Sequence, residues 1–178
     1  CIFHVSSPRK NRIIKRKMDA LVVREIQPGD NPKIARLIRN ILEGMGVPKT
    51  GTAYEDSALD DMYSTYKEPR SSYFIAEKNG RILGCVGVAP LPNYKNNTCE
   101  LQKMYVAEEA RGQGIAQKLM ETCLSKAKAN GFDTCYLETL PFMKAAQGLY
   151  QKSGFHFIEE RLGDTGHYSC TVFMIKKL

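Results

Sequence analysis

A chain of 178 residues with 43% hydrophobic residues can bury one core of ordinary size, so we expect a single folded domain. The formal charge of +7 arises almost entirely in residues 1–17, which hold six of the 26 lysines and arginines and no acidic residue. The rest of the chain, with 20 basic and 19 acidic residues, is nearly neutral, which argues against a nucleic-acid-binding surface. No apolar run reaches membrane-spanning length, so we expect no membrane partner.

We expect residues 1–17 to be a basic extension, either disordered or lying before a natural start at Met18, and residues 18–178 to form the folded domain. The charge of this extension leaves open a nucleic-acid-associated protein anchored through it. The cysteines form no Cys-x-x-Cys pair, so we expect free thiols, no metal site and a reducing, cytoplasmic setting. They are Cys1, Cys85, Cys99, Cys123, Cys135 and Cys170.

The first half of the chain predicts alternating strands and helices. A short apolar strand at 21–25 leads through a Pro-Gly-Asp-Asn turn into a helix, whose apolar residues recur on one face up to Leu42. A second helix is predicted at 57–66. The strongest hairpin signal follows, with strands at 72–78 and 81–88 joined by an Asn-Gly turn.

A strand at 101–106 then runs through a glycine-rich turn at 111–116 into an amphipathic helix. The first N–H groups of a helix have no partner within it and lie at the positive end of its dipole, so they bind anions. Gly112 and Gly114 have no Cβ, which lets phosphate oxygens approach the main chain. The turn lacks the ending of a P-loop, so we interpret it as another kind of pyrophosphate cradle, with Arg111 at its rim.

The last part of the chain predicts a strand at 134–139, a helix from residue 143 onward and two antiparallel strands at 155–161 and 169–177. The helix ends in a Leu-Tyr pair that is followed by Gly-Phe at 154–155. Taken with the first half, this order predicts an α/β domain without internal repeats.

Two motifs at this spacing resemble the signature of the GNAT superfamily of acetyl-CoA-dependent N-acetyltransferases, over roughly residues 20–178. They are Arg111-x-x-Gly114-x-Ala116 and Ala146-x-x-Leu149-Tyr150-x-x-x-Gly154-Phe155. The resemblance implies a single-domain GNAT fold, with a mixed, mostly antiparallel sheet of about seven strands flanked by about four helices. One departure is Met143, because many members have Asn there to hydrogen-bond the pantetheine arm.

The resemblance also implies site residues. Tyr150 is the expected acid for the departing thiolate, with a buried helix aromatic as the structural alternative. Glu100 is the expected base, with Glu138 or an ordered water as its rivals. Strand alternation places Glu100 and Tyr105 on opposite faces, unless the bulge found in the family intervenes. The expected acetyl-CoA-binding residues are Met104, Tyr105, Val106, Arg111, Gly112, Gln113, Gly114, Ile115, Ala116, Ala146 and Tyr150.

The implied activity is transfer of an acetyl group from acetyl-CoA, as co-substrate, to a primary amine of a small molecule or peptide by direct attack in a ternary complex. A non-catalytic acetyl-CoA sensor and an enzyme acting on a protein N-terminus or lysine remain alternatives, and a homodimer stays open. No acceptor is indicated, although several side chains are candidates for its pocket. They are Tyr54, Tyr63, Tyr66, Tyr94, His167 and Tyr168, with Arg70 or Lys95 for a carboxylate and Glu55, Asp56, Asp60 and Asp61 for a polyamine.

Overall fold

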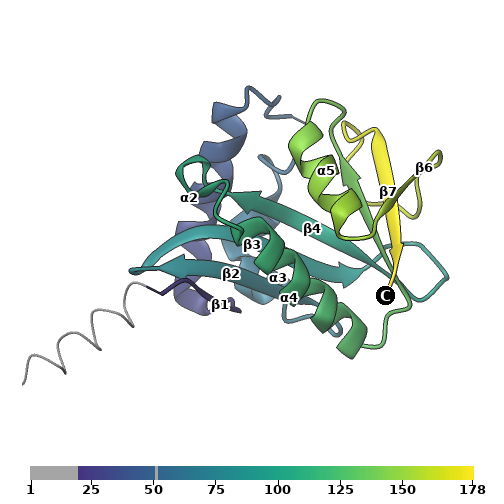
Figure 1. Ribbon diagram of the computed structural model, residues 1–178, viewed down its shortest axis with the longest axis horizontal. Coiled ribbons are helices and arrows are strands. Elements are labelled where there is room, and N and C mark those ends of the chain that lie inside the picture. The colour runs from purple at the N-terminus through teal and green to yellow at the C-terminus, as the bar shows by residue number, and fades with distance from the viewer. Residues whose placement is uncertain (1–19, 51) are drawn as a thin grey trace, which may run out of the picture.

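The computed structural model describes residues 20–50 and 52–178, and a seven-stranded sheet runs through the middle of this region (Figure 1). The strand order is β1-β2-β3-β4-β5-β7-β6. The strands are β1 Val22–Glu25, β2 Ser72–Lys78, β3 Arg81–Pro90, β4 Thr98–Val106, β5 Thr134–Thr139, β6 His156–Ile158 and β7 Val172–Lys177.

Strands β1 to β4 form an antiparallel meander in chain order. The hairpin between β2 and β3 turns at Asn79 and Gly80, whose φ angles of 53° and 73° match the left-handed turn that an Asn-Gly pair favours. The other half of the sheet, β5-β7-β6, is also antiparallel. A single parallel pairing, between β4 and β5, joins the two halves.

Helices cover both faces of the sheet (Figure 1). On one face α4 (Ile115–Ala129) and α5 (Lys144–Lys152) pack over a core that includes Leu119, Met120 and Tyr150. On the other face the core is closed by 3-10 segments and by the remaining two helices. These elements are η1 (Pro28–Asp30), α2 (Asn31–Gly44), η2 (Ser57–Asp61) and α3 (Met62–Thr65), while η3 (Glu108–Ala110) leads into α4.

This architecture confirms the predicted α/β fold with a seven-stranded, mostly antiparallel sheet and four helices within the described residues. Four predicted elements differ from expectation by three residues or more. The helix expected at 57–66 is two short segments, because Asp56 and Asp61 each accept a backbone N–H from the residue two or three positions later and so start a new helix. Strand β4 begins three residues earlier than expected, at Thr98, and β6 ends three residues earlier than expected, at Ile158. Strand β7 begins three residues later than expected, at Val172.

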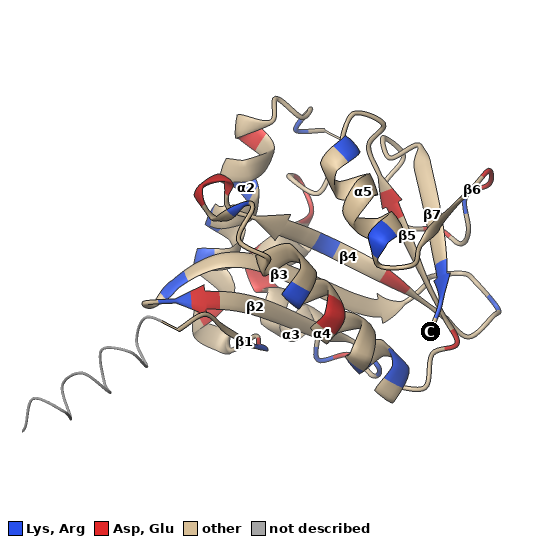
Figure 2. Cartoon of the chain, in the orientation of Figure 1, with Lys and Arg blue, Asp and Glu red and all other residues tan. Residues whose placement is uncertain are grey.

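The predicted extension at 1–17 lies outside the described residues. In the described region basic and acidic side chains are interspersed along the elements (Figure 2). The cysteines of this region, Cys85, Cys99, Cys123, Cys135 and Cys170, are free thiols. Over residues 20–50 and 52–178 no helix is long and apolar enough to cross a membrane, and no group of three or more His, Cys, Asp or Glu side chains is placed to hold a metal ion.

Candidate active site

A β-bulge in β4 determines which side chains of this strand face the site. Cys85 of β3 pairs with Tyr105 and Gly87 pairs with Gln102, so two residues of β4 oppose one of β3. Lys103 lies at the bulge with a φ of 45°, and its carbonyl accepts the Tyr73 hydroxyl at 2.9 Å. The bulge reverses the alternation of side chains along β4. Tyr105 therefore packs on the same side of the sheet as Tyr66, whose hydroxyl donates to Gln102.

The two halves of the sheet separate beyond Glu100. Parallel pairing of β4 with β5 covers only Thr98–Glu100 against Thr134–Tyr136, and from Leu137 onward β5 pairs with β7 alone. The separation opens two neighbouring cavities, a cofactor-side cleft of about 430 Å³ and a chamber of about 100 Å³ that holds Glu100 and Glu138. Both are lined by Met45, Met104, Tyr105, Met143 and Tyr150, so the two cavities adjoin along these side chains.

The glycine-rich turn lies at the end of the cofactor-side cleft. Gly112 and Gly114 have φ angles of 73° and 75°, and a Cβ added at either would meet nothing within 4 Å. The first backbone bond of α4 is donated by Lys118 to the Gly114 oxygen at 3.1 Å, so the main-chain N–H groups of residues 112–117 donate no hydrogen bond to any described residue. Open space, free amides and the N-terminus of a 15-residue helix together suit an anion.

Most of the expected acetyl-CoA-binding residues are brought together in this cleft. Gln113, Gly114 and Ile115 do not line the cleft itself but belong to the same turn. Met143, in place of the usual asparagine, presents a thioether that accepts the Thr139 hydroxyl at 3.7 Å. The expected residues that line the cleft are Met104, Tyr105, Val106, Arg111, Gly112, Ala116, Ala146 and Tyr150.

Tyr150 lies on α5 where the cleft meets the chamber. Its side chain is buried, its ring contacts Phe155 edge-on at 6.1 Å, and its hydroxyl forms no hydrogen bond with any described residue. Burial raises the pKa of Tyr150 to about 12, so the phenol keeps its proton at neutral pH. The side chain can therefore act as a hydrogen-bond or proton donor toward an atom in either cavity.

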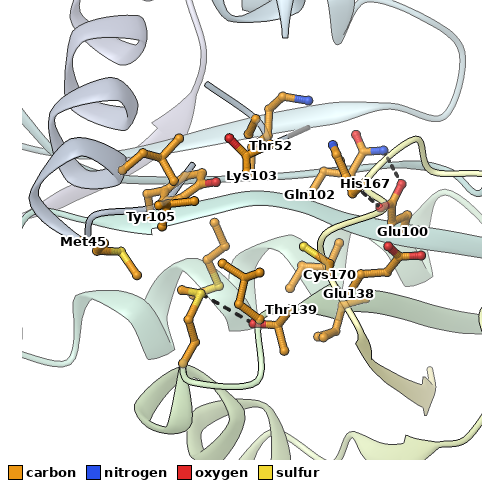
Figure 3. A pocket seen from close by; sticks show the side chains of 18 of the residues that line it. Met45, Thr52, Glu100, Gln102, Lys103, Tyr105, Glu138, Thr139, His167 and Cys170 are labelled. Atoms are coloured by element: carbon orange, nitrogen blue, oxygen red, sulfur yellow. Dashed lines mark hydrogen bonds and ion pairs between the residues drawn. The ribbon is translucent and has the colours of Figure 1, made fainter. Parts of the chain in front are cut away.

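Glu100 lies in the chamber at the last pairing of β4 with β5, and only 2% of the residue is exposed. Gln102 Nε2 donates to Glu100 Oε2 at 2.6 Å, and His167 Nδ1 lies 3.9 Å from Oε1 (Figure 3). Burial raises the pKa of Glu100 to about 7, while burial and the nearby Lys103 ammonium lower the pKa of His167. Near neutral pH Glu100 can thus accept a proton, which is the property required of a general base.

Glu138 lies in the same polar end of the chamber (Figure 3) but has other partners. Tyr136 donates its hydroxyl to Oε1 at 2.8 Å, and Arg161 Nη1 lies 3.2 Å from Oε2, close enough for an ion pair but without hydrogen-bond geometry. Burial raises the pKa of Glu138 as well. Arg161 also donates to the carbonyls of His167 and Cys170 at 3.2 and 2.8 Å, so it holds the loop that walls the chamber.

Sequence reasoning assigned no role to several charged or polar residues of this site, among them Gln102, Lys103, Arg161 and Cys170. The Lys103 side chain is only 7% exposed and its ammonium lies 2.7 Å from Asp56. Among the acceptor-pocket candidates within the described region, His167 alone lines the chamber, and Tyr66 lies behind it by donating its hydroxyl to Gln102 at 2.8 Å. No local pattern reveals the ion pairs of Lys103 with Asp56 and of Arg161 with Glu138, because the two partners of each pair come from distant segments of the chain.

Residues 38–155 match the acetyltransferase (GNAT) family, so the chain belongs to that family and is an acyltransferase, as its two motifs predicted. Uncharacterized N-acetyltransferase YjgM of Escherichia coli K12 is 40% identical over 158 residues, which is 88% of this chain and 95% of that protein. Human N-acetyltransferase 8B is 35% identical over 114 residues, 60% of this chain and 50% of its own, so the chain spans half of that relative.

Solved structures share the fold at low sequence identity. A GNAT-family acetyltransferase from Staphylococcus aureus Mu50 superposes with a TM-score of 0.74 at 20% identity, over 89% of this chain and 99% of its own. The PaiA N-acetyltransferase of Thermoplasma acidophilum, solved in complex with coenzyme A, has a TM-score of 0.67 at 17% identity, over 89% and 99% of the two chains.

Proposed function

We propose that this protein transfers the acetyl group of acetyl-CoA to a primary amine of a small molecule or peptide by direct attack in a ternary complex. One observation carries the proposal: the cleft that begins at the free amides of residues 112–117 adjoins, at Tyr150, the chamber that holds Glu100. Two substrates can thus meet end to end beside a proton donor and a proton acceptor.

Acetyl-CoA fits the residues of the cleft. The amides at 112–117 and Arg111 suit its diphosphate. Among the described residues, no strand lies beside the edge of β4 that faces the cleft after Glu100, so main-chain groups of this edge are available to the pantetheine arm. When bound, acetyl-CoA supplies a thioester carbonyl activated for attack by an amine. The PaiA neighbour was solved with coenzyme A, which supports the same ligand here.

Two side chains of this chain handle the protons. Glu100 takes the proton that the attacking amine must lose, because its raised pKa of about 7 leaves it both ionised and basic near neutral pH. Tyr150 donates a hydrogen bond or proton toward the departing thiolate, because its pKa of about 12 keeps the phenol protonated. Glu138 is the weaker candidate for the base, since it already neutralises Arg161.

The test is release of free thiol from acetyl-CoA with a panel of primary amines, repeated with Tyr150→Phe. We expect turnover that requires an amine, with kcat lowered by roughly 10²-fold or more in the variant and little change in coenzyme A affinity. Phe157→Leu is the matched control, because Phe157 is an exposed aromatic of β6 that lines neither cavity. Binding of coenzyme A without turnover on any amine would favour the sensor and overturn the proposal.

A further inference from the structure

We propose, building on the function above, that the acceptor is an amine with a single positive charge and an otherwise uncharged body, and that the Lys103–Asp56 ion pair is the element that rejects a second charge. The inference comes from the pairing of the charged side chains in and around the chamber.

Within the described chain, Glu100 is the only carboxylate lining the chamber that has no lysine or arginine partner. Its nearest basic group, His167 Nδ1, is 3.9 Å away, and the pKa of this histidine is lowered by burial, which favours its neutral form. The other lining carboxylate, Glu138, is neutralised by Arg161 at 3.2 Å. An incoming ammonium therefore finds one unpaired carboxylate, Glu100.

Lys103, the lysine that lines the chamber, is also already paired with a residue of opposite charge. Lys103 Nζ lies 2.7 Å from Asp56 Oδ2, with the lysine side chain 7% exposed and the aspartate 27% exposed. A substrate carboxylate would have to compete with Asp56 for this ammonium, or be buried without a partner, which is costly. A second substrate ammonium would lie near the like charge of Lys103. It could not pair with Asp56 instead, because that carboxylate already binds Lys103.

The remainder of the chamber wall suits an uncharged body. Away from Glu100 and Glu138, the opposite end of the pocket holds Met45 and Tyr105 (Figure 3). The surfaces between these ends are largely aliphatic, and such walls favour hydrocarbon over charge. The aliphatic lining residues are Leu42, Val47, Ala53, Leu101, Leu137 and Leu140.

Three amines with the same carbon chain test this inference: pentylamine, norleucine, which adds a carboxylate to pentylamine, and 1,5-diaminopentane, which adds a second ammonium. We expect wild-type kcat/KM, measured by thiol release, to favour pentylamine over each of the others by at least about tenfold. Asp56→Asn keeps the cap to Ala58 but leaves the Lys103 ammonium unpaired. This variant should lower the ratio of kcat/KM for pentylamine to kcat/KM for norleucine roughly tenfold. It should leave the ratio for pentylamine over 1,5-diaminopentane unchanged.

Lys103→Met is the reciprocal variant, since it leaves Asp56 unpaired. It should lower the kcat/KM preference for pentylamine over 1,5-diaminopentane and leave the preference over norleucine unchanged. Asp60→Asn is the matched control, because it removes a neighbouring carboxylate whose partner, Arg39, lies outside the chamber, and both preferences should persist. The inference is overturned if the wild type prefers norleucine or the diamine, or if Asp56→Asn and Lys103→Met leave both ratios unchanged. Absence of turnover with any primary amine would overturn the transferase proposal as well.

Discussion

Replacing Glu100 with glutamine is expected to raise the stability of the protein relative to wild type as the pH increases from 5 to 8, and to reduce activity. The folded state holds this carboxyl at a pKa of about 7, against an ordinary value of 4.5, because burial disfavours its charge. A carboxyl whose pKa is raised by folding favours the folded state below its unfolded pKa and loses that contribution as the pH rises toward its folded pKa. The buried charge is therefore a cost that develops between about pH 4.5 and pH 7.

The size of this cost follows from the shift. One pKa unit corresponds to about 1.4 kcal/mol, so a rise from 4.5 to about 7 amounts to about 3 kcal/mol once Glu100 is ionised in both states. About 0.8 kcal/mol of the cost is already present at pH 5, so about 2.5 kcal/mol develops between pH 5 and pH 8. For a chain of 178 residues it corresponds to a change in Tm of roughly 5–10 °C. Any cost of burying the glutamine amide is independent of pH, so it cancels when the two pH values are compared.

The assay is thermal unfolding of wild type and Glu100→Gln at pH 5 and at pH 8. The quantity compared is the Tm of the variant minus the Tm of wild type at each pH. We expect this Tm difference to be roughly 5–10 °C more positive at pH 8 than at pH 5. Glu159→Gln is the control, since this carboxylate is exposed. The Tm difference between this variant and wild type should be the same at both pH values. A Glu100→Gln difference equal at both pH values would refute the argument that burial holds the proton on Glu100.

Three further results are expected. The logarithm of kcat/KM for an amine should rise to a break near pH 7 as Glu100 loses its proton, and a pH–rate profile of Glu100→Gln should lack that break. Arg161→Lys should raise KM for the amine at least about threefold and leave KM for acetyl-CoA unchanged. Arg161 holds Glu138 with Nη1 and the His167 and Cys170 carbonyls with Nη2, whereas lysine has a single nitrogen for both tasks. Equal changes in the two KM values, measured by steady-state kinetics, would contradict this. Gly114→Val should weaken coenzyme A binding by roughly tenfold in calorimetry, since a β-branched residue is strained at a φ of 75°, and unchanged affinity would argue against this turn as the diphosphate site.

Local sequence signals predicted most of the fold. The Asn79-Gly80 hairpin and the helix that begins at Ile115 follow from short-range chemistry, namely turn conformations that Asn and Gly favour and an apolar stripe at helical spacing. The segment at 57–66 was predicted as one helix because its composition suits one. Two successive aspartate caps divide it, and composition alone does not distinguish a capping aspartate from a solvated one.

The candidate site was predictable only where one motif contains its residues. The turn around Gly112 and the Leu-Tyr pair ending at Tyr150 are contiguous in sequence, whereas the partners of the chamber are not. Lys103 meets Asp56, and Arg161 meets Glu138, through the way the sheet and its last loop fold back. Strand alternation alone would also have misplaced Lys103, because the bulge depends on pairing with β3.

The narrow junction between the two halves of the sheet links ligand occupancy to the integrity of the fold. Three residue pairs, Thr98–Glu100 with Thr134–Tyr136, hold the halves together, and past them the facing edges of β4 and β5 have no strand between them. An extended ligand lying along that gap would supply main-chain partners that a continuous sheet would otherwise provide. Its binding energy would then resist the opening of the seam, so that the protein would be most resistant to heat and proteolysis while loaded and most vulnerable just after product leaves.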